Sequence, residues 1–256
     1  MNLFDLTGKV AIITGSSRGI GRAIAEAMAA QGAKVVISSR KAEACQEVAD
    51  AINADHPGAA IVVPASISSK DALQELVDET RKQFGRIDIL VCNAASNPYY
   101  GPMGGISDDQ FRKILDNNVI ANHWLIQMVA PEMLERGEGS IIIVSSIGGL
   151  TSSATIGAYN ISKAADFQLA RNLAAEFGPS GVRVNCIAPG LVRTDFAKAL
   201  WENPDTLKVV TRHTPMRRIG EPHEIAGAVA YLGSDSSTFM PGQTIVIDGG
   251  VTTASV

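Results

Sequence analysis

The fold is decided at residues 9–21, which read KVAIITGSSRGIG. Residues 9–14 form a short apolar run rich in β-branched side chains, which predicts a buried strand. Residues 20–30 predict a helix, so a Gly-x-x-x-Gly-x-Gly turn joins the two elements. Glycines let backbone N–H groups approach a pyrophosphate, and a helix N-terminus favours an anion. An ordinary glycine turn is the alternative, but ligands gather at the carboxyl ends of such strands, which favours a phosphate site.

The rest of the chain repeats this alternation of strand and helix. Further strands are predicted at 34–38, 60–63, 87–92, 140–144, 182–187 and 244–247, and helices at 42–54, 71–84, 108–135 and 158–177. Almost all the strands are continuous apolar runs, which is typical of a parallel sheet covered on both faces. We therefore predict an α/β fold with a doubly wound parallel sheet of about seven strands, in one domain spanning 1–256. We expect the 108–135 helix to be interrupted near Pro131.

Composition narrows the classes of protein. The chain has 256 residues and a net charge of −4, so no basic face indicates nucleic acid. We find no run of 18 apolar residues and no signal peptide, so we expect a cytoplasmic protein with no membrane partner. The three cysteines predict neither disulfides nor a Cys-x-x-Cys site, and the four scattered histidines predict no metal site.

A tyrosine and a lysine at helical spacing are the first candidates for chemistry. Tyr159 and Lys163 are four residues apart in the predicted 158–177 helix, so they share a face. An ammonium nearby favours phenolate and is expected to lower the pKa of the tyrosine from about 10. The pair is therefore a plausible general acid and base.

Together the motifs resemble the short-chain dehydrogenase/reductase family over essentially the whole chain. They are TGSSRGIG at 14–21, CNAA at 92–95, Asn118, Ser146, YNISK at 159–163, PGLVRT at 189–194 and IDGG at 247–250. Within this family, the sequence most resembles NADP(H)-linked carbonyl reductases of the dehydrogenase/reductase type. The resemblance implies a Rossmann-like fold, a homotetramer or homodimer, and hydride transfer between a nicotinamide and a carbonyl/alcohol pair.

The resemblance also implies residue roles. Tyr159 would exchange the proton with the substrate oxygen, and Lys163 would support it and bind the ribose of the cofactor. Ser146 would hydrogen-bond the substrate oxygen. Asn118 would help hold a water that links Lys163 to solvent.

Cofactor contacts are implied along the same edge of the sheet. They comprise Gly15, Ser17, Arg18, Gly19, Ile20, Gly21, Ser39, Arg40, Ser66, Asn93, Ala94, Tyr159, Lys163, Pro189, Gly190, Val192 and Thr194. Arginine at the end of the second strand suits a 2′-phosphate, whereas an acidic residue there suits NAD. No carboxylate occurs from 34 to 41, so Arg40 predicts NADP(H), and Arg18 is expected to face the same corner.

The irregular stretch at about 190–221 is interpreted as a flap over the substrate. Large apolar residues there and after the fourth strand predict a substrate pocket that Ser146 and Tyr159 complete. They are Tyr99, Tyr100, Met103, Leu191, Phe196, Leu200 and Trp201. Packing in the core or at an oligomer interface is the alternative for Leu200 and Trp201.

Two other functions are weighed against a carbonyl reductase. A reductase of 3-oxoacyl thioesters on an acyl carrier protein has the same chemistry and would need a basic docking face. Six residues could form it: Arg112, Lys113, Arg171, Arg212, Arg217 and Arg218. A non-catalytic NADP-binding regulator is expected to lack one of Ser146, Tyr159 and Lys163, and all three are present.

Overall fold

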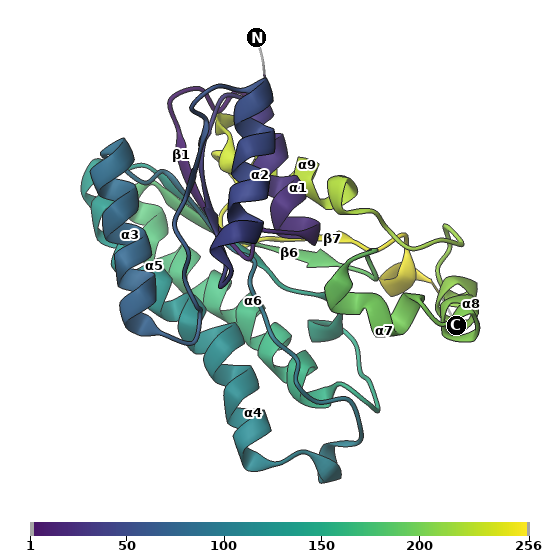
Figure 1. The fold of residues 1–256 in the computed structure, drawn as a ribbon. Helices are drawn as coiled ribbons and strands as arrows, with labels where there is room; N and C mark the ends of the chain where they lie inside the picture. The colour runs from purple at the N-terminus through teal and green to yellow at the C-terminus, as the bar shows by residue number, and fades with distance from the viewer. Residues whose placement is uncertain (1–2, 255–256) are drawn as a thin grey trace.

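A parallel sheet of seven strands forms the centre of the computed structural model, which describes residues 3–254 (Figure 1). The strands are β1 Val10–Thr14, β2 Lys34–Ser38, β3 Ala60–Val62, β4 Ile89–Cys92, β5 Gly139–Val144, β6 Val182–Pro189 and β7 Thr244–Ile247. Their order is β3-β2-β1-β4-β5-β6-β7, and every pair is parallel. The predicted doubly wound α/β fold is confirmed.

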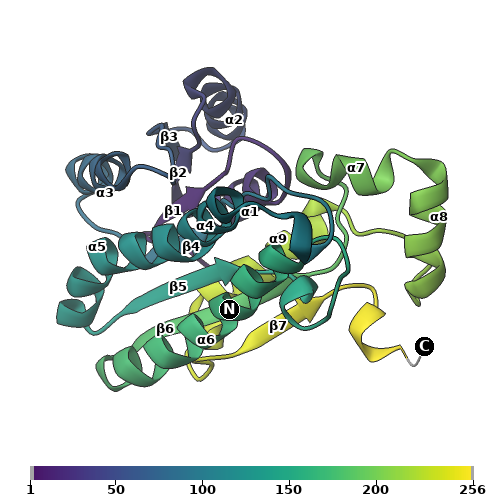
Figure 2. The same ribbon diagram turned by 90° about the horizontal axis from the view of Figure 1, so that it is seen from below.

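Helices cover both faces of the sheet (Figure 2). They are α1 Gly19–Ala30, α2 Ala42–Asp55, α3 Lys70–Phe84, α4 Asp108–Leu115, α5 Ala121–Arg136, α6 Gly157–Phe177, α7 Lys198–Trp201, α8 Pro204–His213 and α9 Pro222–Gly233. One apolar core holds side chains of α3, α5 and α6, and the other those of α1, α2 and α9. Both faces of the strands are thus buried, which explains why the strand sequences are continuously apolar.

The order of the strands reverses at β1. The chain places β2 and β3 on one side of β1 and then returns to place β4 to β7 on the other. In such a sheet the connections diverge and leave a crevice at the carboxyl ends of the neighbouring strands. Thr14 ends β1 and Cys92 ends β4, so the glycine turn and the CNAA stretch both open onto this crevice.

Two expectations for the helices need correction. Pro131 lies inside α5 without ending it, and the 108–135 helix is instead interrupted by a π-helix, η2, at Asp116–Ile120. The helix α9 was not predicted from the sequence at all. Its start carries a capping box between Glu221 and Glu224 and a proline at Pro222.

The predicted flap is partly regular. It holds α7 and α8, which both views place at one side of the sheet, away from α3 and α5 (Figures 1 and 2). Asn203 caps α8, because its side chain accepts hydrogen bonds from the N–H groups of Asp205 and Thr206. Pro204 then occupies the first turn, where its missing N–H is no loss.

Candidate active site

The glycine turn between β1 and α1 is shaped by contacts that only glycine allows. Gly15 and Gly19 have φ values of 67° and 56°, in the left-handed region. At Gly21 a Cβ would lie 2.4 Å from the Gly15 oxygen and 2.5 Å from Asn93 Nδ2. The side chain of Arg18 does not cap α1, which leaves backbone N–H groups at its first turn without that partner. This cradle fits the pyrophosphate of a dinucleotide.

Side chains tie this loop to the neighbouring strands. Asn93 Nδ2 donates to the Thr14 oxygen at 2.8 Å, and Thr14 Oγ1 accepts from the N–H groups of Asn93 and Ala94. On the other side, buried Ser16 donates to the Ile13 oxygen and accepts from the N–H of Ser38. Ser16 was not singled out from the sequence, because a buried serine in a glycine loop has no pattern of its own.

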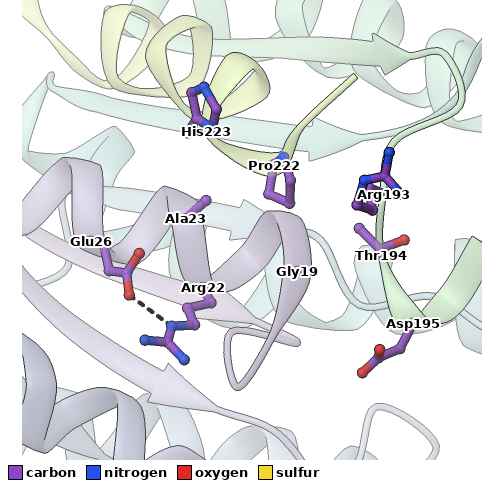
Figure 3. Close-up of a pocket in the computed structure, with 9 residues that line it drawn as sticks. All are labelled: Gly19, Arg22, Ala23, Glu26, Arg193, Thr194, Asp195, Pro222 and His223. Atoms are coloured by element: carbon purple, nitrogen blue, oxygen red, sulfur yellow. Dashed lines mark hydrogen bonds and ion pairs between the residues drawn. The ribbon is translucent and has the colours of Figure 1, made fainter. Parts of the chain in front are cut away.

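The first turn of the flap packs on the same loop. A Cβ at Gly19 would lie 3.1 Å from Thr194 Cγ2, so the two residues nearly touch. Arg18 forms an ion pair with Asp195 at 3.1 Å and so faces the flap, where the sequence led us to expect the Arg40 corner. A cavity of about 350 Å³ lies beside this junction, lined by α1, α9 and residues 193–195 (Figure 3).

Further along, the flap folds back on itself. Gly190 lies against Asp248, where a Cβ would be 2.8 Å from the Asp248 Cα. Val192 is buried and bridges to Gly220, and Pro189 is buried at the end of β6. Thr194 caps the short 3₁₀ helix Asp195–Ala197 through its Oγ1.

Ser146, Tyr159 and Lys163 converge beyond the end of β5. Ser146 directly follows Val144–Ser145 and opens the 3₁₀ helix η3 Ile147–Gly149, while the other two residues lie in the first turns of α6. Lys163 Nζ lies 5.7 Å from the centre of the Tyr159 ring. The predicted cluster is therefore brought together by β5 and α6. Ser145 points away from it, since its Oγ donates to the Lys163 carbonyl.

The pKa of Tyr159 is set by opposing effects. Burial raises the pKa, and the Lys163 ammonium and the Ser146 hydroxyl lower it. The net shift is upward from the ordinary value, opposite to the expected direction, because burial disfavours phenolate more than the lysine favours it. The pKa of Lys163 is also raised: burial lowers it, but the Asp166 carboxylate and Tyr159 outweigh burial.

Asn118 lies in the π-helix η2 and is completely buried. Its Oδ1 accepts from the Ser96 N–H at 2.8 Å, and its Nδ2 donates to Ser96 O and to Ser162 Oγ, both at 3.0 Å. The widened turn thus directs the amide toward α6, beside the Tyr159–Lys163 face. Its neighbour Asn117 instead donates to Ser96 Oγ. Of the two asparagines, the structure places Asn118 next to the cluster.

The corner after β2 holds an unpaired cation. Arg40 is exposed, and within residues 3–254 its guanidinium has no hydrogen bond or ion pair. Ser39 Oγ lies 3.1 Å from Cys45 Sγ, and Ser66 Oγ lies 2.9 Å from Ser68 Oγ. The described chain groups no three His, Cys, Asp or Glu residues as a metal site would require.

The residues expected to line the substrate pocket are only partly gathered. Phe196 packs on Tyr159 with ring centres 6.0 Å apart, and Met103 lies against Gly157 at the start of α6. Trp201 turns away, since its Nε1 donates to Thr194 O. Tyr99 also bonds its own loop, through Pro102 O. Tyr100 is exposed and Leu191 is half-buried.

Gly21→Ala is expected to weaken both folding and dinucleotide binding. The new methyl group has no room between the Gly15 oxygen and Asn93, and overpacking of this kind costs about 1–3 kcal/mol. Thermal unfolding and the Kd for NADPH measure the two effects.

Gly227→Ala is the matched control, because Gly227 is an exposed residue of α9 with open space at its Cβ. It should stabilise the protein by about 0.5–1 kcal/mol and leave the Kd unchanged. If Gly21→Ala bound NADPH as tightly as Gly227→Ala, the cradle would not be the pyrophosphate site.

A doubly wound sheet with a Ser–Tyr–Lys cluster beyond its central strands defines the class of dinucleotide-dependent oxidoreductases. A family model described as enoyl-(acyl carrier protein) reductase matches residues 15–252. Dehydrogenase/reductase SDR family member 4 of Bos taurus is 42% identical over 248 residues, which is 96% of this chain and 88% of that protein. The chain belongs to the short-chain dehydrogenase/reductase family.

Solved structures of similar proteins have the same fold. A gluconate 5-dehydrogenase from Burkholderia cenocepacia, in complex with NADP and tartrate, has a TM-score of 0.94 and 32% identity over 99% of both chains. A 7α-hydroxysteroid dehydrogenase complexed with NADH and a 7-oxo bile acid has a TM-score of 0.92 and 37% identity, covering 97% of this chain and 96% of that one. Similar structures thus hold different cofactors and different small molecules, so the specificity of this chain has to come from its own residues.

Proposed function

We propose that this protein is an NADP(H)-dependent oxidoreductase that interconverts carbonyl compounds and secondary alcohols, as a carbonyl reductase does. The observation that carries the proposal is the convergence of Ser146, Tyr159 and Lys163 at the carboxyl end of β5, beside the buried amide of Asn118. The glycine cradle, with the relative that holds NADP, supports the cofactor. Bound NADPH supplies the hydride, and NADP⁺ accepts it in the reverse direction.

The side chains then handle the proton. Tyr159 Oη gives its proton to the carbonyl oxygen during reduction and takes it back during oxidation. The Gly148 N–H donates to Ser146 Oγ at 3.0 Å and fixes it, so the serine hydroxyl can donate to the same substrate oxygen. The Lys163 ammonium stabilises the phenolate that forms, and Asn118 would hold water toward solvent.

The cofactor would be held by the residues that line the crevice. Gly15, Gly19 and the N-terminus of α1 would receive the pyrophosphate, with Ser17, Arg18, Ile20 and Gly21 in the same loop. Asn93 and Ala94 would lie along the riboses. Ser66 would face the adenine, and Val192 and Thr194 the nicotinamide amide.

A screen of NADPH oxidation against simple ketones, diketones and an acetoacetyl thioester tests the proposal. We expect turnover of ketones or diketones above that of the thioester. The docking face for an acyl carrier is weakened, because Arg112 pairs with Asp108 and Arg218 with Glu224. No turnover of any carbonyl compound would contradict the proposal, and a preference for the thioester would favour the acyl carrier protein reductase.

Phe196→Ala is expected to raise the KM for a bulky apolar ketone by about 10-fold and to change kcat little. The reason is that Phe196 packs on Tyr159 at 6.0 Å and is still 55% exposed, which suits a residue that covers the substrate. Steady-state kinetics with acetone and with a bulky aryl ketone measure the difference. Phe4→Ala, which removes a 42% exposed ring that packs on another tyrosine, Tyr231 in α9, serves as the control. Equal KM changes in both variants would exclude Phe196 from the pocket.

The remaining proposals concern the whole molecule. We propose a homotetramer or homodimer, which light scattering measures. The edge strand β7 exposes Val246, and Phe239 before it is fully exposed, which supports an interface there. No helix among residues 3–254 is long and apolar enough to cross a membrane. We propose one domain, with a flap at 190–221, in the cytoplasm.

A further inference from the structure

A buried carboxylate, that of Asp166, forms an ion pair with Lys163 of the active site. Asp166 follows Lys163 by one turn of α6, and neither side chain is more than 2% exposed. Lys163 Nζ donates to Asp166 Oδ2 at 3.1 Å and to the Val144 carbonyl at 3.0 Å. An ammonium has three donors, so one remains for the side where Tyr159 lies.

The rest of this polar site also holds the carboxylate in place. Asn122 Nδ2 donates to Asp166 Oδ1 at 3.2 Å and to the Asn118 carbonyl at 2.7 Å. A hydrogen-bonded chain thus runs from the π-helix η2 through α5 to Asp166. Asn122 and Asp166 have no part in the proton transfer proposed for Tyr159, although they surround Lys163, which that transfer needs.

The other titratable groups around Asp166 come from β4 and β6. They are the thiols of Cys92 and Cys186, and burial raises the pKa of both, so they stay neutral. From α6 itself come Lys163 and Tyr159. Within the described chain, Lys163 is therefore the one cation that pairs with Asp166.

We propose that Asp166 is a positioning residue of the active site: its carboxylate neutralises the buried Lys163 ammonium, fixes Nζ, and sets the pH at which the Tyr159–Lys163 pair exchanges its proton. The inference rests on the proposed function. Its basis is the cost of an isolated buried charge, which a lysine otherwise avoids by losing its proton.

Asp166 and Lys163 stabilise each other's charge. Burial raises the pKa of Asp166 above its ordinary value, and the Lys163 ammonium and the Asn122 amide offset only part of that rise. The same carboxylate raises the pKa of Lys163 and also that of Tyr159. The pair is thus neutral overall, and the lysine acts on the tyrosine from a fixed position.

The sign of the effect follows from charge alone. Asp166→Asn removes one negative charge and keeps the shape of the side chain. The Tyr159–Lys163 pair then loses its first proton at a lower pH, whichever residue releases it, because the remaining site is more positive.

The experiment measures kcat/KM against pH in both directions for the wild type and Asp166→Asn. We expect the midpoint of the alkaline fall in reduction, and of the rise in oxidation, to move down by about one pH unit or more. Asn122→Ala removes a hydrogen bond to Asp166 without changing the charge, so the midpoints of its pH profiles should equal those of the wild type. If Asp166→Asn lowered activity with no shift, or if Asn122→Ala shifted as much, the inference would be wrong.

A second measurement covers an Asp166→Asn variant that does not fold. In wild type labelled with ¹³C at aspartate carboxyl groups, the Asp166 signal is assigned by its contact with the Lys163 side chain. An ionised carboxylate at pH 7 supports the inference, and a protonated acid overturns it. This readout does not need turnover. If the reductase screen failed, the proposed function would be refuted, but the NMR measurement would still give the charge of Asp166.

Discussion

Tyr159→Phe is expected to lower kcat by about 10²–10⁴-fold, the typical contribution of a positioned proton donor. The substitution removes one oxygen and leaves the ring in contact with its neighbours, because Phe196 still packs on it and Lys163 Nζ still lies near it. Stability and NADPH affinity should therefore stay close to those of the wild type. Single-turnover reduction of a ketone, with NADPH binding and thermal unfolding measured in parallel, separates the chemical step from binding.

Tyr231→Phe is the matched control for this prediction. It makes the same chemical change in α9, where the ring packs edge-on against Phe4. Its kcat should equal that of the wild type. A Tyr159→Phe enzyme that turns over as fast as this control would remove Tyr159 from the mechanism.

The upward shift in the Tyr159 pKa suits this role as a proton donor. A phenol with a raised pKa stays protonated at neutral pH, which is the form that reduction needs. The reverse reaction needs phenolate, so the alcohol dehydrogenase activity should grow as pH rises. At neutral pH Tyr159 is thus in the protonation state that carbonyl reduction needs.

Sequence was sufficient for the parts of the fold that depend on local pattern. The strands were found because both faces of the sheet are buried, and β2 and β7 match their predicted bounds. The helix α9 was missed although its buried apolar residues recur at helical spacing, at Ile225, Val229 and Leu232. Its capping box and Pro222 were the signals that could have found it.

Less of the active site than of the fold could be predicted from the sequence. Tyr159 and Lys163 follow from helical spacing, and Asp166 extends the same face at the seventh position, which is the signal that was overlooked. Residue spacing cannot predict burial. The local sequence does not show that the Asp166 carboxylate in α6 is fully buried, or that burial outweighs Lys163 in setting the pKa of Tyr159. Both depend on α5 and β6, which are distant in the sequence.

The corner after β2 shows the same limit. Arg18 was expected to face the same corner as Arg40, but Arg18 pairs with Asp195 in the flap. Of these two arginines, Arg40 is the one that is exposed and unpaired within the described chain, and the segment 34–41 holds no carboxylate. The choice of cofactor should therefore depend on one side chain.

Arg40→Asp is accordingly expected to reverse the preference from NADPH to NADH. A guanidinium forms charge-assisted hydrogen bonds with a 2′-phosphate, and such a bond is worth roughly 1.5–3 kcal/mol, or about 10- to 150-fold in affinity. An aspartate there repels the phosphate and can accept hydrogen bonds from the ribose hydroxyls of NADH. The ratio of kcat/KM for the two cofactors, measured in wild type and variant, gives the size of the change.

Lys82→Asp controls for the change in net charge, because it alters the exposed face of α3 by the same two units. Its cofactor ratio should equal that of the wild type, since a screened surface charge outside the crevice acts weakly. Two results would contradict the role of Arg40: a wild type that already prefers NADH, or an Arg40→Asp variant whose ratio matches Lys82→Asp. Because the Arg18–Asp195 ion pair is exposed and therefore weak, the same cofactor ratio measured for Arg18→Ala, alone and combined with Arg40→Asp, shows whether Arg18 can replace Arg40.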